Sequence, residues 1–139
     1  MKNILVLCTG NSCRSQMAHG YFKQLGGDKL HVYSAGVETH GLNKRAVKVM
    51  MLDGVDISSH TSNLVEDYSQ INFDFIITVC DHAKETCPVI SSKGERFHHN
   101  FTDPSKIESD NEEEIMNAFV KTREEIKSYV TSFLKVNLA

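Results

Sequence analysis

An eight-residue run near the N-terminus has the residue types of a cysteine nucleophile in an anion-binding loop. Residues 8–15 read Cys-Thr-Gly-Asn-Ser-Cys-Arg-Ser and follow the apolar run Ile-Leu-Val-Leu at 4–7. Five residues separate Cys8 from Arg14, enough backbone to curl once around a tetrahedral oxyanion and return the guanidinium to the sulfur. Gly10 and Asn11 tolerate positive φ, so the loop amides can point inward, and a helix beginning near Cys13 adds its positive N-terminal end. The candidate oxyanion-binding residues are Thr9, Gly10, Asn11, Ser12, Cys13, Arg14 and Ser15.

The same positive field is expected to activate the thiol of Cys8. Cysteines beside arginine or at helix N-termini have a pKa of roughly 3.5 to 7.5, so we expect Cys8 to be a thiolate at neutral pH. The hydroxyl of Ser15 is also placed to donate a hydrogen bond to that sulfur. The alternative is a Gly-Asn turn that merely joins a strand to a helix, with Cys8 an inert buried thiol. Because the nucleophile, turn residues, arginine and hydroxyl share one short window, the pattern favours catalysis.

Two more cysteines, Cys80 and Cys87, follow the apolar segment 73–79. In an open parallel sheet the carboxyl ends of the strands share one edge, so Cys80 is expected on the same rim as Cys8. If the segment between Cys80 and Cys87 is helical, the two lie about two turns apart, beyond the roughly 7 Å between Cα atoms that a relaxed disulfide allows. Bridging them would require this segment to unwind. The alternative is two unrelated buried cysteines, and Cys13 is interpreted as a packed small hydrophobic residue.

A leaving oxygen needs a proton, and the pair Asp103-Pro104 offers a carboxylic acid held in a turn. Asp103 is therefore the candidate general acid. The alternative is an ordinary surface turn, which such a pair also forms.

The run at 8–15 resembles the Cys-x5-Arg-Ser signature of the low-molecular-weight tyrosine phosphatase superfamily, which includes phosphatases and thioredoxin-coupled arsenate reductases. The spacing of Cys8, Cys80 and Cys87, with Thr-Val before Cys80 and Pro88 after Cys87, is similar to that of the reductases, and the resemblance covers nearly the whole chain. It implies that Cys8 attacks arsenate and that Cys80 then releases arsenite, leaving a Cys8/Cys80 disulfide. Cys87 displaces Cys8, and thioredoxin reduces the Cys80/Cys87 disulfide. In the superfamily an Asp-Pro pair at this position supplies the general acid.

Two other functions remain open from the sequence. One is a phosphatase that uses Cys8, Arg14 and Asp103 through a cysteinyl-phosphate intermediate, with the other cysteines protecting against oxidation. The other is an oxyanion-binding or redox-sensing module without turnover. Phosphatases of the superfamily tend to have aromatic residues directly after Asp-Pro, whereas Ser105 and Lys106 follow here. This difference favours a small inorganic oxyanion, with arsenate as substrate and phosphate or sulfate as competitors.

No bound metal or cofactor is expected. Some relatives bind potassium through carboxylates at positions where this chain has His19 and Asn63. Asn11, Ser34 and Asn63 could still supply oxygens, but a hard cation would lose its main charge compensation. The chain has seven histidines without a CxxC or HxxxH spacing, and the adjacent pair His98-His99 would point to opposite faces of a strand.

Length and composition fit a single catalytic domain over residues 1–139. The net charge of −3, with both signs interspersed, gives no reason to expect a nucleic acid or an anionic membrane as partner. The first apolar run is too short for a signal peptide, and no segment approaches a membrane span. We expect a cytoplasmic monomer, in which the four cysteines remain reduced.

Strand and helix patterns alternate along the chain, which predicts an α/β fold. The resemblance implies a three-layer α/β/α arrangement around a four-stranded parallel sheet. Strands are expected at 3–7, 31–34, 73–79 and about 96–99. Helices are expected from Cys13, with Met17, Tyr21 and Leu25 on one face and a stop at Gly26-Gly27, and from about 43 to 52. A final helix from Glu113 repeats apolar residues at three- and four-residue steps, which gives one face for the sheet.

Overall fold

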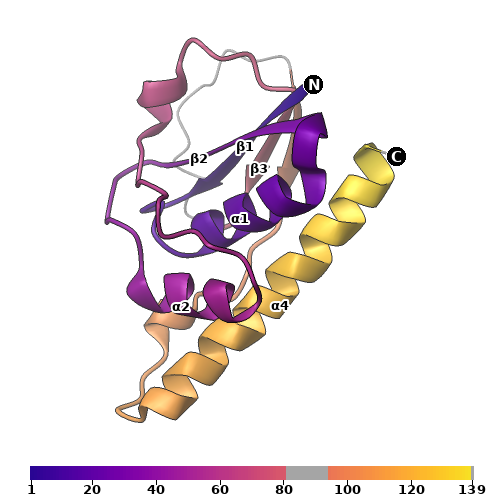
Figure 1. Ribbon diagram of the computed structural model, residues 1–139. Coiled ribbons are helices and arrows are strands. Elements are labelled where there is room, and N and C mark those ends of the chain that lie inside the picture. Colours follow the sequence, from indigo (N-terminus) through magenta and orange to yellow (C-terminus); the bar gives the residue numbers. More distant parts are fainter. Residues whose placement is uncertain (81–93, 139) are drawn as a thin grey trace.

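The computed structural model describes residues 1–80 and 94–138 (Figure 1). Four parallel strands form one sheet in the order β2-β1-β3-β4: β1 (Lys2–Cys8), β2 (Leu30–Gly36), β3 (Phe75–Thr78) and β4 (Glu95–His98). The inner strand β1 has a continuous buried run, Ile4 to Leu7, as expected for a parallel strand covered on both faces. The expected α/β fold with a four-stranded parallel sheet is confirmed.

The described helices begin and end close to the positions that the sequence predicts. They are α1 (Arg14–Gly26), α2 (Lys44–Leu52) and α4 (Glu112–Asn137), with short 3-10 turns η1 (Gly27–Lys29), η2 (Val65–Tyr68) and η3 (Pro104–Lys106). Asn43 caps α2 and Asn111 caps α4, each accepting hydrogen bonds from two backbone amides of the first turn. Three glutamates complement the helix dipole in the first turn of α4.

Aromatic side chains join the layers on both faces of the sheet. On one face, Phe133 of α4 makes edge-on contacts with Phe22 of α1 and with Phe75 and Phe97 of the sheet, so α1 and α4 cover this face together (Figure 1). The register pairs Ile4 with Phe75 and the next residue, Leu5, with Tyr33, which places Tyr33 on the opposite face. There Tyr33 packs against Tyr68 and Phe73.

The amphipathic pattern of the last helix is confirmed, because Phe119, Thr122, Ile126, Val130 and Phe133 are all buried. The pattern of the first helix holds for Met17 and Tyr21 but is wrong for Leu25, which is 46% exposed beside the helix end. No helix in the described ranges 1–80 and 94–138 is long and apolar enough to cross a membrane.

The strand order sets the position of the candidate site. β1 lies between β2 and β3, and the segments that leave the carboxyl ends of β1, β3 and β4 emerge at the same edge of the sheet. Cys8 ends β1, Cys80 follows β3, and Asp103 follows β4. Residues far apart in the sequence therefore meet at one edge, where ligands bind in open α/β sheets.

Candidate active site

The loop between β1 and α1 turns around Asn11. Asn11 is the residue of this loop with positive φ, at 46°, and its side chain is fully buried. Gly10 tolerates a positive φ but does not have one here. Gly10 is needed for a different reason, since a Cβ there would collide with the ring of His40.

Three hydrogen bonds hold Asn11 in this unusual conformation. Its Nδ2 donates to the carbonyl oxygen of Ser34 (3.1 Å), its Oδ1 accepts from the hydroxyl of Ser15 (2.8 Å), and its carbonyl oxygen accepts from Nε2 of Gln16 (3.1 Å). The expected bond from Ser15 to the sulfur of Cys8 is therefore wrong, because the hydroxyl is committed to Asn11. Ser15 supports the loop from beneath, where it is fully buried.

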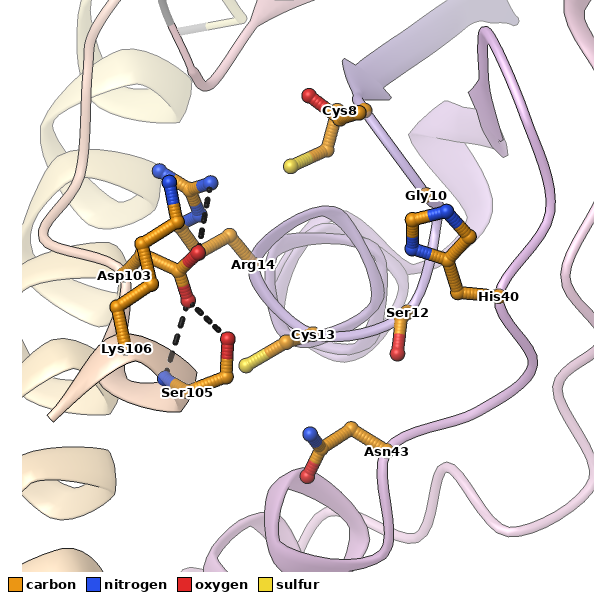
Figure 2. Close-up of a pocket in the computed structure, with 11 residues that line it drawn as sticks. Cys8, Gly10, Ser12, Cys13, Arg14, His40, Asn43, Asp103, Ser105 and Lys106 are labelled. Atoms are coloured by element: carbon orange, nitrogen blue, oxygen red, sulfur yellow. Dashed lines mark hydrogen bonds and ion pairs between the residues drawn. The ribbon is translucent and has the colours of Figure 1, made fainter. Parts of the chain in front are cut away.

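The loop borders a cavity of about 390 Å³ (Figure 2). Among the expected oxyanion-binding residues, Asn11 and Ser15 do not line it, and the other five do. The lining residues are Cys8, Thr9, Gly10, Ser12, Cys13, Arg14, His40, Asn43, Asp103, Ser105 and Lys106. The structure thus brings the candidate nucleophile, the arginine and the candidate general acid to one cavity.

Arg14 and Asp103 form an ion pair at the wall of this cavity. Nη2 of Arg14 lies 3.4 Å from Oδ2 of Asp103, and Nη1 donates to the carbonyl oxygen of Phe101 at 2.8 Å. Both charged side chains are largely buried, with 10% and 18% exposure. Oδ1 of Asp103 accepts hydrogen bonds from the amide (3.0 Å) and hydroxyl (2.6 Å) of Ser105, so the turn η3 fixes the carboxylate.

Cys8 and Cys80 are buried next to each other. The side-chain hydrogen bond with Cys80 raises the pKa of Cys8 well above its ordinary value, burial adds to this effect, and the charge of Arg14 opposes it. The expectation that Cys8 is a thiolate at neutral pH is therefore wrong for this arrangement, because a neighbouring thiol and a dry environment favour the protonated form. Cys80 also lies 3.3 Å from Oγ1 of Thr9. Cys87 lies outside the described residues.

The fourth thiol, Cys13, lines the cavity although it is only 7% exposed. Burial, and then the nearby charge of Asp103, raise the pKa of Cys13 to about 12. Cys13 is therefore protonated at neutral pH, as expected for a packed thiol.

The polar side chains considered for a potassium site have hydrogen-bond partners within the protein. Nδ1 of His19 lies 2.7 Å from Oγ of Ser34, and the rings of His19 and His60 are 4.3 Å apart. Oδ1 of Asn63 accepts a hydrogen bond from the hydroxyl of Thr61. Burial, the neighbouring His60 and Lys23 lower the pKa of His19 to about 3, so its imidazole is neutral. Within residues 1–80 and 94–138, no three side chains of the metal-binding types lie together.

Sequence reasoning did not identify His40 and Asn43 as cavity residues. The segment that carries them follows the loop through backbone hydrogen bonds, from the amide of His40 to the carbonyl oxygen of Gly10 (2.9 Å) and from that of Asn43 to Ser12 (3.0 Å). Asn43 could have been recognised as a helix cap, but its place at the cavity depends on these long-range bonds.

Comparison with known proteins agrees with this geometry. Residues 3–138 match the family model described as low molecular weight phosphotyrosine protein phosphatase. The chain is 46% identical over 132 residues to the arsenate reductase of Halalkalibacterium halodurans and 45% identical to that of Bacillus subtilis, covering 95% of this chain and 94% of each relative. A solved structure titled "An arsenate reductase in the phosphate binding state" has a TM-score of 0.77 at 28% identity and covers 97% of this chain and 98% of its own. The chain therefore belongs to the low molecular weight phosphotyrosine protein phosphatase family.

Proposed function

We propose that this protein reduces arsenate to arsenite, using Cys8, Cys80 and Cys87 in turn and thioredoxin as the external reductant. The observation that carries the proposal is that Cys8, which lines the oxyanion cavity, lies close to Cys80 and that both thiols are buried. A hydrolytic phosphatase has no need of a second thiol against its nucleophile, whereas a reductase requires one. The names of the relatives from H. halodurans and B. subtilis support the same activity.

The first step is the condensation of Cys8 with arsenate. The loop amides and Arg14 bind the oxyanion, and Sγ of Cys8 forms a bond to arsenic while one oxygen leaves. The thiol proton of Cys8 passes to an arsenate oxygen, and Asp103 gives a proton to the leaving oxygen, which departs as water. An oxyanion that binds at the loop competes with Asp103 for the guanidinium of Arg14.

The second step transfers two electrons to arsenic. The thiolate of Cys80 attacks Sγ of Cys8, the sulfur–arsenic bond breaks with its electron pair moving to arsenic, and arsenite leaves. The product is a Cys8/Cys80 disulfide. The closeness of these two buried thiols supports this step, because the attacking sulfur has only a short distance to move.

The third step moves the oxidised bond away from the cavity. The thiolate of Cys87 attacks Sγ of Cys80, Cys8 leaves as the thiolate, and thioredoxin then reduces the Cys80/Cys87 disulfide through thiol–disulfide exchange. The role of Cys87 rests on the resemblance of its spacing to that in the reductases. We further propose that the protein works as a monomer in the cytoplasm, because thiols remain reduced in that compartment.

The shape and lining of the cavity support an inorganic substrate. A tetrahedral oxyanion, counted as five groups of about 30 Å³ each, would fill less than half of the space. Besides the residues of the loop, the cavity is lined by Ser105, Lys106, His40, Asn43 and Asp103. These side chains suit water or charged oxygens better than an aromatic ring, which usually stacks on aromatic or apolar groups.

The test is arsenate-dependent NADPH oxidation in the presence of thioredoxin and thioredoxin reductase. The intact protein should turn over, Cys80→Ser should release no arsenite, and Cys87→Ser should release one equivalent of arsenite and stop as a Cys8/Cys80 disulfide. The disulfide is detected by mass spectrometry after digestion. Sustained turnover by Cys87→Ser, or no arsenite from the intact protein, would refute the relay.

A phosphatase is the second candidate, favoured by the meeting of Cys8, Arg14 and Asp103 in one cavity. It would form a cysteinyl-phosphate intermediate that water hydrolyses. Hydrolysis of an aryl phosphate that survives Cys80→Ser and Cys87→Ser, without arsenate turnover in the intact protein, would establish this function instead.

A further inference from the structure

The charges that line the cavity are unequally compensated. The guanidinium of Arg14 is paired with the carboxylate of Asp103, and the imidazole of His40 lies 3.2 Å from the carboxylate of Glu38. Lys106 also lines the cavity, and within residues 1–80 and 94–138 its ammonium forms no ion pair or side-chain hydrogen bond. Its charge therefore remains available to an anion in the cavity.

The backbone of Lys106 is held in place although its side chain is exposed. It ends the turn η3, which begins with the buried Pro104 and is capped by Asp103, and the amide of Lys106 donates to the carbonyl oxygen of Asp103 at 3.3 Å. Figure 2 shows the side chain on the same side of the cavity as Asp103 and Arg14. The long stem can adjust while its origin stays fixed beside the general acid.

Lys106 also borders a second cavity, of about 500 Å³, between η3 and the first half of α4. It is thus part of the boundary between that space and the oxyanion cavity. Figure 2 shows its side chain on the side of the oxyanion cavity away from Gly10 and Ser12 of the loop.

We propose that Lys106 is a specificity-determining residue, whose ammonium binds the outward oxygens of a small inorganic oxyanion. This inference deepens the proposed function and rests on it for the identity of the substrate. An inorganic oxyanion presents charged oxygens on its outer side, whereas a phosphate ester presents its organic group there. A lysine in this place favours the inorganic oxyanion over the phosphate ester, because its charge attracts charged outer oxygens and gains nothing from an organic group.

The binding of inorganic phosphate, measured by isothermal titration calorimetry, tests the role of Lys106 without requiring turnover. Lys106→Met keeps the length of the side chain and removes the charge, and should weaken phosphate binding about three- to fivefold, the upper part of the range of an exposed charge pair. Lys106→Arg should restore binding to within about twofold. The matched control is Lys121→Met, an exposed lysine that lines only the second of the two cavities and should leave binding unchanged.

Ionic strength and kinetics supply two further readouts. Phosphate binding by the intact protein should weaken more steeply with added salt than binding by Lys106→Met. The reason is that salt screens the charge of Lys106, which the variant lacks. With arsenate, Lys106→Met should raise KM while kcat stays within about twofold, as expected for loss of a contact made equally in the ground and transition states.

The outcomes separate this inference from the proposed function. Weaker phosphate binding by Lys106→Met but not by Lys121→Met supports the role of Lys106, even if the intact protein fails to reduce arsenate. Equal phosphate affinity of Lys106→Met and the intact protein would overturn it, even if arsenate reduction is established. Absence of phosphate binding by the intact protein would overturn it as well.

Discussion

The guanidinium of Arg14 lies 3.4 Å from the carboxylate of Asp103, a residue 89 positions later in the chain. The two charges compensate each other, and an incoming oxyanion competes with Asp103 for the same arginine. The ion pair thus links anion binding at the loop to the side chain that we propose as general acid.

Asp103→Asn should separate binding from chemistry. The amide keeps the shape of the side chain but cannot donate a proton as an acid, so we expect kcat to fall about 10²- to 10⁴-fold. Inorganic phosphate should bind at least as tightly as to the intact protein, because the competing carboxylate is gone. Steady-state kinetics and calorimetry measure the two effects. Unchanged kcat would show that another group protonates the leaving oxygen.

Removal of the Cys80 sulfur should make Cys8 more acidic. The hydrogen bond with Cys80 is the largest cause that raises the pKa of Cys8, so Cys80→Ala should lower this pKa. Alkylation requires the thiolate, and its pH profile should therefore shift to lower pH, with faster reaction at neutral pH. Mass spectrometry assigns the modified residue, and the high pKa of Cys13 keeps that thiol protonated. An unchanged profile for Cys8 would mean that burial alone sets its pKa.

The sequence was sufficient to predict the elements and the central loop because their signals are local. Helical periodicity located α4, and the window at 8–15 holds the nucleophile and the arginine together. The details of that loop were less accessible. The steric limit on Gly10 comes from the ring of His40, and the hydroxyl of Ser15 is taken by Asn11. Such choices depend on contacts that form only when distant segments meet.

The ionisation of Cys8 could not be predicted from the sequence either. Arg14 and a helix N-terminus predict a lowered pKa, but the neighbouring thiol comes from the end of β3. Topology places Cys80 at the same edge of the sheet as Cys8, while the packed structure shows that the two thiols are buried close together. The balance between these opposing effects is decided by burial and geometry.

His19 should make the protein lose stability in acid. Its pKa falls from 6.5 to about 3 in the folded protein, so between these values the unfolded chain binds more protons. Stability contributed by neutral His19 is complete above pH 6.5 and falls with decreasing pH, by up to about 1.4 kcal/mol per pH unit. His19→Gln should flatten this dependence in urea unfolding at neutral and mildly acidic pH. The matched control is His31→Gln, at an exposed position of β2, which should keep the slope of the intact protein. Equal slopes for all three proteins would exclude this role of His19.

Asn43 should contribute to helix stability and to anion binding through different atoms. Its Oδ1 accepts hydrogen bonds from the amides of Arg45 (2.9 Å) and Ala46 (3.1 Å), and the side chain also lines the oxyanion cavity. Asn43→Asp keeps an equally good cap but adds a negative charge beside the cavity. The free energy of unfolding should therefore change little, while phosphate binding weakens several-fold through like-charge repulsion.

Asn43→Ala removes the helix cap without adding a charge beside the cavity. Loss of the cap should cost about 1 kcal/mol in the free energy of unfolding. Phosphate should bind more tightly to Asn43→Ala than to Asn43→Asp, because alanine introduces no charge. Urea titrations and calorimetry on the two variants test both parts. Equal phosphate affinity of Asn43→Asp and the intact protein would show that position 43 lies too far from the bound anion to influence it.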